Sequence, residues 1–135
     1  GDGTGGESVF QDENGRVQPF EDEYSMDLWH FNGALSMVND GAEDNNGSRF
    51  CFVQSSSVNA DMLLEMKNIG FPSNVILKYA GVGGAPWLDT KQVVFAQVYD
   101  GLDVLDAIAA VKVDENGVPK ENVVINSMSV EKYQG

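Results

Sequence analysis

Residues 33–54 read GALSMVNDGAEDNNGSRFCFVQ, and this stretch decides the fold class. An apolar run suited to a buried strand lies near each end of it, over 34–38 and over 49–54. The ten residues between the runs are rich in Asn, Asp and Gly, which favour turns. The stretch therefore predicts two strands joined by an ordered polar loop.

Two helices are predicted next. Asn59 is a suitable N-cap, and apolar side chains follow it at helical spacing, at Met62, Leu63, Met66 and Ile69. Gly70 and Pro72 end this helix, and Ser73 is expected to cap a second, shorter helix that runs to Tyr79. Together they form a helical insert at about 59–80.

Three more elements are expected towards the C-terminus. Residues 93–98 are typical of a strand, and residues 102–111 of a helix with one apolar face, made by Leu105, Ile108 and Ala109. A turn at 116–117 precedes a last strand over 123–130, where the side chains alternate. Residues 1–27 are expected to be loop with at most a short strand, and the whole chain, 1–135, a single domain.

The charge balance excludes some partners. Twenty-one acidic residues against eight basic ones give a net charge of −13, which repels phosphate backbones and anionic membranes. Nucleic acid is therefore not an expected ligand, and the apolar runs are too short to span a bilayer. We interpret the acidity as a solubility feature.

Motifs for other chemistry fail. The only cysteine, Cys51, allows neither an internal disulfide nor a cysteine-based metal site. Gly1, Gly3 and Gly6 match G-x-G-x-x-G without the strand and helix that a dinucleotide site needs. His30 is the only histidine and no G-x-S-x-G occurs, so His30 is expected to be a structural hydrogen-bonding residue. No cofactor is expected.

Three segments in the same order resemble cyclophilins: GTGGES at 3–8, GALSMVN at 33–39 continued by NGS at 46–48, and WLD at 87–89 followed by KQVVF at 91–95. FEDE at 20–23 and GLDVLD at 101–106 also fit the spacing of that family. The insert over 59–83 looks like one found in bacterial members.

The resemblance implies a mainly β fold with helices, built on an antiparallel β-barrel. It also implies peptidyl-prolyl cis-trans isomerase activity that assists protein folding, with proline-containing peptides or unfolded proteins as partners. In that family the catalytic arginine and the first strands lie upstream of the segment matched by 3–8. The barrel is therefore expected to be incomplete at its N-terminal side.

Carried over position by position, Val38, Asn39 and Asp40 fall where the family holds the peptide. Trp87 and Leu88 match the rim of the proline pocket, although core packing is an equal alternative for Leu88. Two further pocket positions differ in type, with Cys51 where the family has phenylalanine and Gln92 where it has histidine.

Arg49 stands where the family usually has glutamine, and two interpretations stay open. Arg49 supplies the missing catalytic cation from a new direction, or it forms a surface ion pair with one of the many acidic residues. These departures also favour an alternative function, a non-catalytic proline-peptide-binding or interaction module.

An incomplete barrel would leave open strand edges and an exposed core face. Self-association, or pairing with a complementing N-terminal segment, is therefore expected. The chain starts at Gly1 rather than Met, so removal of a signal segment is an open alternative and both a cytoplasmic and a secreted location are compatible with the sequence.

Overall fold

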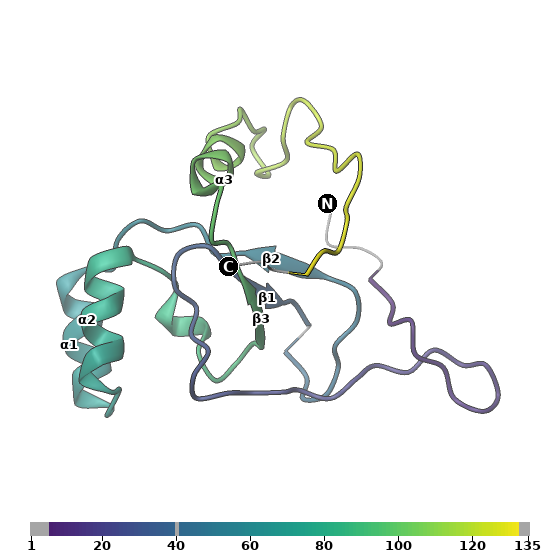
Figure 1. The fold of residues 1–135 in the computed structure, drawn as a ribbon, viewed down its shortest axis with the longest axis horizontal. Helices are drawn as coiled ribbons and strands as arrows, with labels where there is room; N and C mark the ends of the chain where they lie inside the picture. Colours follow the sequence, from purple (N-terminus) through teal and green to yellow (C-terminus); the bar gives the residue numbers. More distant parts are fainter. Residues whose placement is uncertain (1–5, 40, 133–135) are drawn as a thin grey trace.

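The computed structural model describes residues 6–39 and 41–132. A small sheet lies at the centre, the paired helices α1 and α2 lie on one side of it, and α3 lies beyond one end (Figure 1). In chain order the elements are β1 (Ala34–Met37), β2 (Phe50–Phe52), α1 (Ala60–Asn68), α2 (Ser73–Val82), the 3-10 turn η1 (Pro86–Leu88), β3 (Val94–Gln97) and α3 (Leu102–Ala109).

The sheet is antiparallel, with the order β2-β1-β3. Ser36 pairs with Cys51 on one side and with Val94 on the other. Leu35 pairs with Ala96, so Phe95 is an extra residue in β3 and forms a β-bulge there. The two strands predicted from residues 33–54 and the strand predicted at 93–98 are thus present, each slightly shorter than expected.

A closed barrel is not confirmed. Within the described part of the chain the sheet has three strands, and its outer strands β2 and β3 are not joined to each other. The last predicted strand, over 123–130, is wrong: residues 121–132 lie outside any helix or strand and are all exposed. An alternating pattern forms a strand only where a neighbour supplies hydrogen bonds, and these residues have no β partner among the described ones.

The helical insert is confirmed, with a correction at its second helix. The side chain of Asn59 accepts a hydrogen bond from the Met62 backbone at 2.8 Å, as expected of an N-cap. Ser73 is not a cap, because Pro72 holds that position and Ser73 is already helical. The second helix is also the longer one, since it continues past Tyr79 to Val82 before Gly83 ends it.

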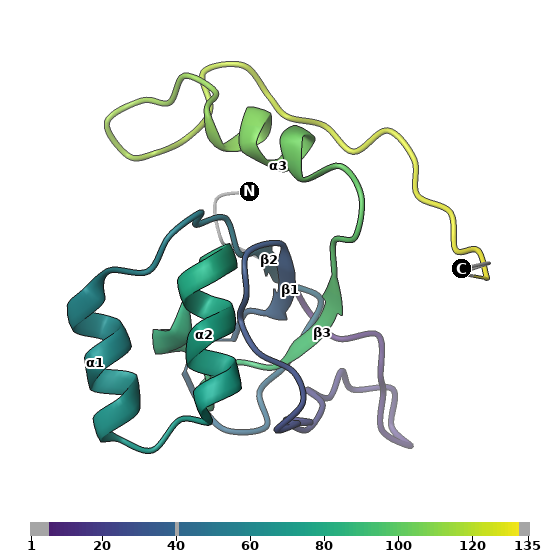
Figure 2. The ribbon, with the colours of Figure 1, turned by 60° about the vertical axis from the view of Figure 1, so that its left-hand side comes forward.

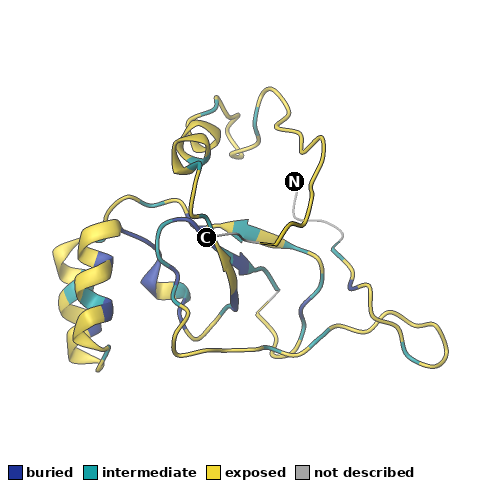
Figure 3. Ribbon diagram, in the orientation of Figure 1, coloured by how far each residue is buried: buried dark blue, intermediate teal, exposed yellow. Residues whose placement is uncertain are grey.

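The buried hydrophobic residues form two clusters. Buried residues are dark blue in Figure 3. The sheet cluster is made by Ala34, Val53, Ala85 and Val94, with Leu88 packed against it. The insert cluster is centred on Met66, Val75 and Tyr79, and its partly buried neighbours include Trp29, Phe31 and Phe71. The insert thus has a small hydrophobic core of its own, beside that of the sheet.

Helix α3 lies apart from both clusters (Figure 2). None of its residues is buried, and Ile108 on its predicted apolar face is 44% exposed. A hydrogen bond of 2.8 Å from Gln54 Nε2 to Asp106 Oδ1 connects the helix to the chain just after β2. The helix is therefore present where the sequence predicts it, with its apolar face uncovered by the described residues.

The segment before β1 is loop, as predicted for the described part of residues 1–27. A turn at Asn14 and Gly15 brings Gln11 and Val17 together in a single β-bridge, and Gly15 adopts a φ of +75°. Of the helices in residues 6–39 and 41–132, none has the length and apolar character needed to cross a membrane.

Candidate functional site

Three of the predicted site residues lie along the pair β1 and β2. The Val38 backbone N–H donates to the Arg49 carbonyl at 3.0 Å, just beyond the two strands. Cys51 lies two residues further on, opposite Ser36. Because alternate strand residues point to the same face, Arg49 and Cys51 belong to one face of this pair. The sheet therefore brings Val38, Arg49 and Cys51 together.

The side chain of Arg49 extends towards the N-terminal segment. It occupies the space that a Cβ at Gly6 would need, so only glycine fits at that position beside it. A polar hollow there is lined by Gly6, Glu7, Asn46 and Arg49 among others. Arg49 is half-buried, and its interactions leave it with a partner.

The loop between β1 and β2 is held by side-chain hydrogen bonds. Asn46 is buried, and its Nδ2 donates to the Phe20 carbonyl at 3.1 Å and to Asp22 Oδ1 at 2.8 Å. Asp22 and Asp44 each accept the backbone N–H of the other, at 3.0 and 2.9 Å. The loop is thus fastened to the segment around Phe20, as expected of an ordered loop.

Asn39 lies at the start of this loop and its side chain is used locally. Its Oδ1 accepts the Gly41 backbone N–H at 3.0 Å. Asp40, another predicted peptide-binding residue, lies outside the described residues.

Cys51 is half-buried, and this burial raises the pKa of its thiol above the ordinary value. The aromatic rings beside it in sequence, Phe50 and Phe52, pack against each other with centroids 5.8 Å apart. Phe50 also contacts Phe95, the bulge residue of β3. These rings lie on the face opposite Cys51, so Phe52 does not replace the aromatic ring missing at position 51.

A second group of predicted site residues lies on one hydrogen-bonded turn. The backbone N–H groups of Leu88, Lys91 and Gln92 bond to carbonyls three or four residues earlier, at 3.0 to 3.1 Å. We call residues 85–92 the rim turn. Trp87 is 51% exposed on it, whereas Leu88 packs against the sheet cluster. Leu88 thus takes part in core packing, which was the alternative to a place at the pocket rim.

Gln92 ends the rim turn and faces another hollow. That hollow is lined by Tyr24, Leu28, Trp29 and Gln92 among others, and neither Arg49 nor Cys51 lines it. The Oε1 atom of Gln92 is buried and has no hydrogen-bond partner among the described residues. Arg49 and Cys51 thus lie outside the lining of the hollow that Gln92 borders.

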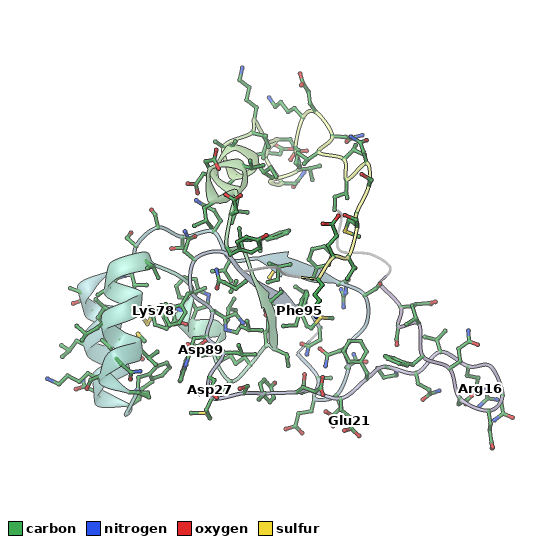
Figure 4. The ribbon with its side chains drawn as sticks, viewed as in Figure 1. Arg16, Glu21, Asp27, Lys78, Asp89 and Phe95 are labelled. Carbon is green, nitrogen blue, oxygen red and sulfur yellow. The ribbon has the colours of Figure 1, made fainter. Side chains whose placement is uncertain are left out.

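Asp89, which Figure 4 labels, is buried and lies at the centre of a hydrogen-bond network. Its Oδ1 accepts from the His30 backbone at 3.0 Å and lies 2.7 Å from His30 Nδ1, and its Oδ2 accepts from the Tyr79 hydroxyl at 2.7 Å. His30 Nε2 in turn lies 2.9 Å from Ser36 Oγ. Because a carboxylate only accepts, His30 Nδ1 carries a proton.

The order of these contacts, serine to histidine to aspartate, is that of a hydrolase triad. Ser36 is 0% exposed and His30 is 2% exposed, so no substrate reaches the serine. The prediction that His30 is a structural hydrogen-bonding residue is confirmed. Sequence reasoning did not find the roles of Tyr79 and Asp89, because Asp89 and His30 are 59 residues apart and no local motif connects them.

Burial strongly raises the pKa of Tyr79, and the adjacent Asp89 carboxylate raises it further as both a hydrogen-bond partner and a charge. Tyr79 therefore stays protonated and donates to Asp89. Within residues 6–39 and 41–132, no group of three or more His, Cys, Asp or Glu side chains is arranged to hold a metal ion.

Comparisons with known proteins agree on a family. The family model described as "Cyclophilin type peptidyl-prolyl cis-trans isomerase/CLD" matches residues 1–130. A protein of Staphylococcus saprophyticus is 40% identical over 128 residues, and one of Staphylococcus aureus strain USA300 is 41% identical over 130 residues. Both are named "Putative peptidyl-prolyl cis-trans isomerase".

The matches cover 95% and 96% of this chain but 61% and 62% of the two relatives. The chain thus spans about three fifths of the length of the curated relatives it matches. The match of the family model to nearly the whole sequence shows that the chain belongs to the cyclophilin-type peptidyl-prolyl cis-trans isomerase family.

Proposed function

We propose that this chain forms most of a cyclophilin-type peptidyl-prolyl cis-trans isomerase, which binds proline-containing segments of peptides or unfolded proteins and assists their folding. The observation that carries the proposal is the family match over residues 1–130. The relatives carry the name of an isomerase rather than of a binding module. This favours catalysis over the alternative of a non-catalytic module.

The reaction makes modest chemical demands. Rotation about an amide bond crosses a barrier of about 18 to 20 kcal/mol, because the bond loses its partial double-bond character at the twisted geometry. A protein lowers this barrier when it binds the twisted amide better than either planar form. An apolar seat for the proline ring, hydrogen bonds to the peptide backbone and a directed cation meet this demand.

The peptide groove that we propose runs between the strand pair and the rim turn. Val38, Asn39 and Asp40 would hold the peptide backbone, and Trp87 and Leu88 would border the proline ring. The half-exposed indole of Trp87 supports this placement, because an exposed aromatic ring offers apolar area to a ligand. Cys51, half-buried on the strand beside Val38, would lie beneath the ring, and Gln92 is the remaining residue of the proposed groove.

Arg49 keeps two roles, which one substitution distinguishes. If Arg49 is the cation that acts on the twisted amide, Arg49→Ala would lower kcat/KM about 100-fold, the usual effect of losing one such donor. If Arg49 instead forms a surface ion pair, its loss would leave the rate unchanged. Arg49→Lys is the matched control, since it keeps the positive charge.

One face of the sheet carries three exposed aromatic rings, which we call the aromatic face, and this supports the proposal of a partner chain. Phe50, Phe52 and Phe95 are 41%, 44% and 49% exposed and lie on the same face. Three adjacent exposed aromatic rings are unusual on a free surface and typical of one that another chain covers. We propose that a second copy of this chain, or a complementing segment, covers this face.

The test of the proposed function is the cis–trans exchange rate of a short Ala-Pro peptide, measured by NMR with the chain at micromolar concentration. We expect faster exchange, and we expect Trp87→Ala to reduce the acceleration. If the chain binds the peptide without any acceleration, the non-catalytic module is favoured instead. If no proline peptide binds, both are refuted for this chain.

A further inference from the structure

The helical insert is connected to the rim turn through one buried hydrogen bond. The Tyr79 hydroxyl of α2 donates to Asp89 Oδ2 at 2.7 Å, and the two residues are 0% and 7% exposed. Asp89 is also the C-cap of η1, where its own N–H bonds to the Pro86 carbonyl at 3.2 Å. The same residue therefore belongs to the network of the insert and to the turn that carries Trp87.

We propose that Tyr79 is a positioning residue for the peptide groove: through Asp89 it fixes the rim turn, so the insert sets how tightly the groove binds proline peptides. This inference rests on the proposed function for the groove itself. It assigns the insert a part in ligand recognition.

The rim turn is arranged to move as a unit. Its internal backbone hydrogen bonds join residues 85–92, and these include three of the predicted site residues, Trp87, Leu88 and Gln92. Thr90, with a φ of +65°, makes the sharp bend within it. A displacement of Asp89 is therefore expected to move the whole turn and not only one side chain.

Tyr79 is itself firmly held. Its ring packs on Phe31 with centroids 4.6 Å apart, and it belongs to the insert cluster with Met66 and Val75. The backbone of Gly84, just after α2, lies so close to His30 and to the Tyr79 ring that a Cβ there would collide with both. The Ala85 N–H also bonds to the His30 carbonyl at 2.8 Å. The insert thus provides a rigid anchor for the hydroxyl.

The side chain of Trp87 depends on this anchor for its direction. Because half of the indole is exposed, protein contacts constrain it on one side, and its position follows the backbone of η1. Without the bond from Tyr79, Asp89 keeps its partner His30 but loses the contact from the insert. A small rotation of the turn is then expected, and the indole would move with it.

The test compares Tyr79→Phe with the parent and with Tyr99→Phe, which removes a hydroxyl from a side chain that is 81% exposed. The first readout is the NMR resonance of the Trp87 indole N–H in the absence of peptide, assigned by its loss in Trp87→Phe. The second is the Kd of an Ala-Pro peptide. A purely structural role lowers stability but changes neither readout in the folded fraction.

We expect Tyr79→Phe to shift the indole resonance and to weaken peptide binding by about threefold to tenfold, the range for loss of one hydrogen bond. The Tyr99→Phe control should change neither. Unchanged resonance and unchanged Kd in Tyr79→Phe would overturn the inference. A parent chain that binds no peptide would refute the proposed function, while the indole resonance would still decide whether Tyr79 positions the turn.

A second variant covers the case in which Tyr79→Phe does not fold. Asp89→Leu keeps a similar side-chain size but has no polar atom, so Tyr79 and His30 both lose this partner. Measured in trimethylamine N-oxide, which favours folded states, it should shift the same resonance and weaken the same binding. A normal indole resonance in this variant would also contradict the inference.

Discussion

Asp89 is the shared acceptor of Tyr79 and His30, and it joins a helix of the insert to the segment that precedes the sheet. Its carboxylate is nearly fully buried and accepts three hydrogen bonds, two at one oxygen and one at the other. A buried carboxylate of this kind is tolerated because its partners compensate for the water it has lost. Changes at Asp89 should therefore affect stability well beyond the local turn.

Asp89→Ala should lower the free energy of unfolding by about 3 kcal/mol or more, because it leaves the buried donors of Tyr79 and His30 without an acceptor. Urea denaturation followed by circular dichroism measures this change. Asp100→Ala, at an exposed position, is the matched control and should stay within about 0.5 kcal/mol of the parent. Equal stability of the two variants would contradict the network described here.

The free energy of unfolding should depend on pH because of Tyr79, and it should fall above about pH 10. The pKa of Tyr79 is raised above its ordinary value of 10.0, so above that pH the unfolded chain loses a proton that the folded chain keeps. The unfolded state then binds fewer protons, and the free energy of unfolding falls by about 1.4 kcal/mol per pH unit for this one group. Below that pH this contribution is constant.

Tyr79→Phe isolates this effect. The difference in free energy of unfolding between the parent and Tyr79→Phe should be constant from pH 7 to 9 and should shrink as the pH rises past about 10. Urea titrations at several pH values measure it. A difference that does not change with pH would mean that Tyr79 ionises as freely in the folded chain as in the unfolded one.

Cys51 should react slowly with iodoacetamide at neutral pH. Its thiol is half-buried and burial raises its pKa, so little of the reactive thiolate is present. Alkylation followed by mass spectrometry should be faster in urea than in buffer. If Cys51 lies beneath the proline ring, as we propose, a saturating proline peptide should slow the reaction further, whereas an alanine peptide of the same length should not.

The aromatic face of the sheet should drive association. We expect the sedimentation coefficient of the chain to increase with concentration, and Phe50→Ser to reduce this increase. Leu77→Ser is the matched control, because Leu77 is 72% exposed on helix α2, away from the sheet. A monodisperse monomer at every concentration would remove the support for a covered face in this chain.

Local signals in the sequence predicted the elements that depend on neighbouring residues. Asn59 caps α1 because its side chain and the next turn of helix supply everything the cap requires. Ser73 failed as a cap because Pro72 holds the N-cap position and Ser73 is already the first residue of the helix. The error was thus one residue, and the existence of the helix was correct.

Features that depend on distant residues were harder to predict. Residues 123–130 have the alternation of a strand, but that pattern cannot say which strand lies beside it. The network at Asp89 was not predicted either, since its members come from the loop before β1, from β1, from α2 and from the rim turn. Among the predicted site residues, the proximity of Arg49, Val38 and Cys51 follows from strand register, which the sequence pattern predicts. The direction of Gln92 depends on the tertiary packing of the rim turn, which the pattern does not predict.

The bulge in β3 keeps the aromatic ring of Phe95 out of the core. Val94 lies in the core opposite Ser36, while Phe95 and Ala96 both face the other way. In a regular ladder that kept the pairs of Ala34 with Gln97 and of Leu35 with Ala96, Phe95 would lie opposite Ser36, where His30 leaves no room for a phenylalanine ring. The effect of a one-residue deletion in β3 should therefore depend on its position, because loss of Phe95 leaves a regular ladder with Val94 still opposite Ser36.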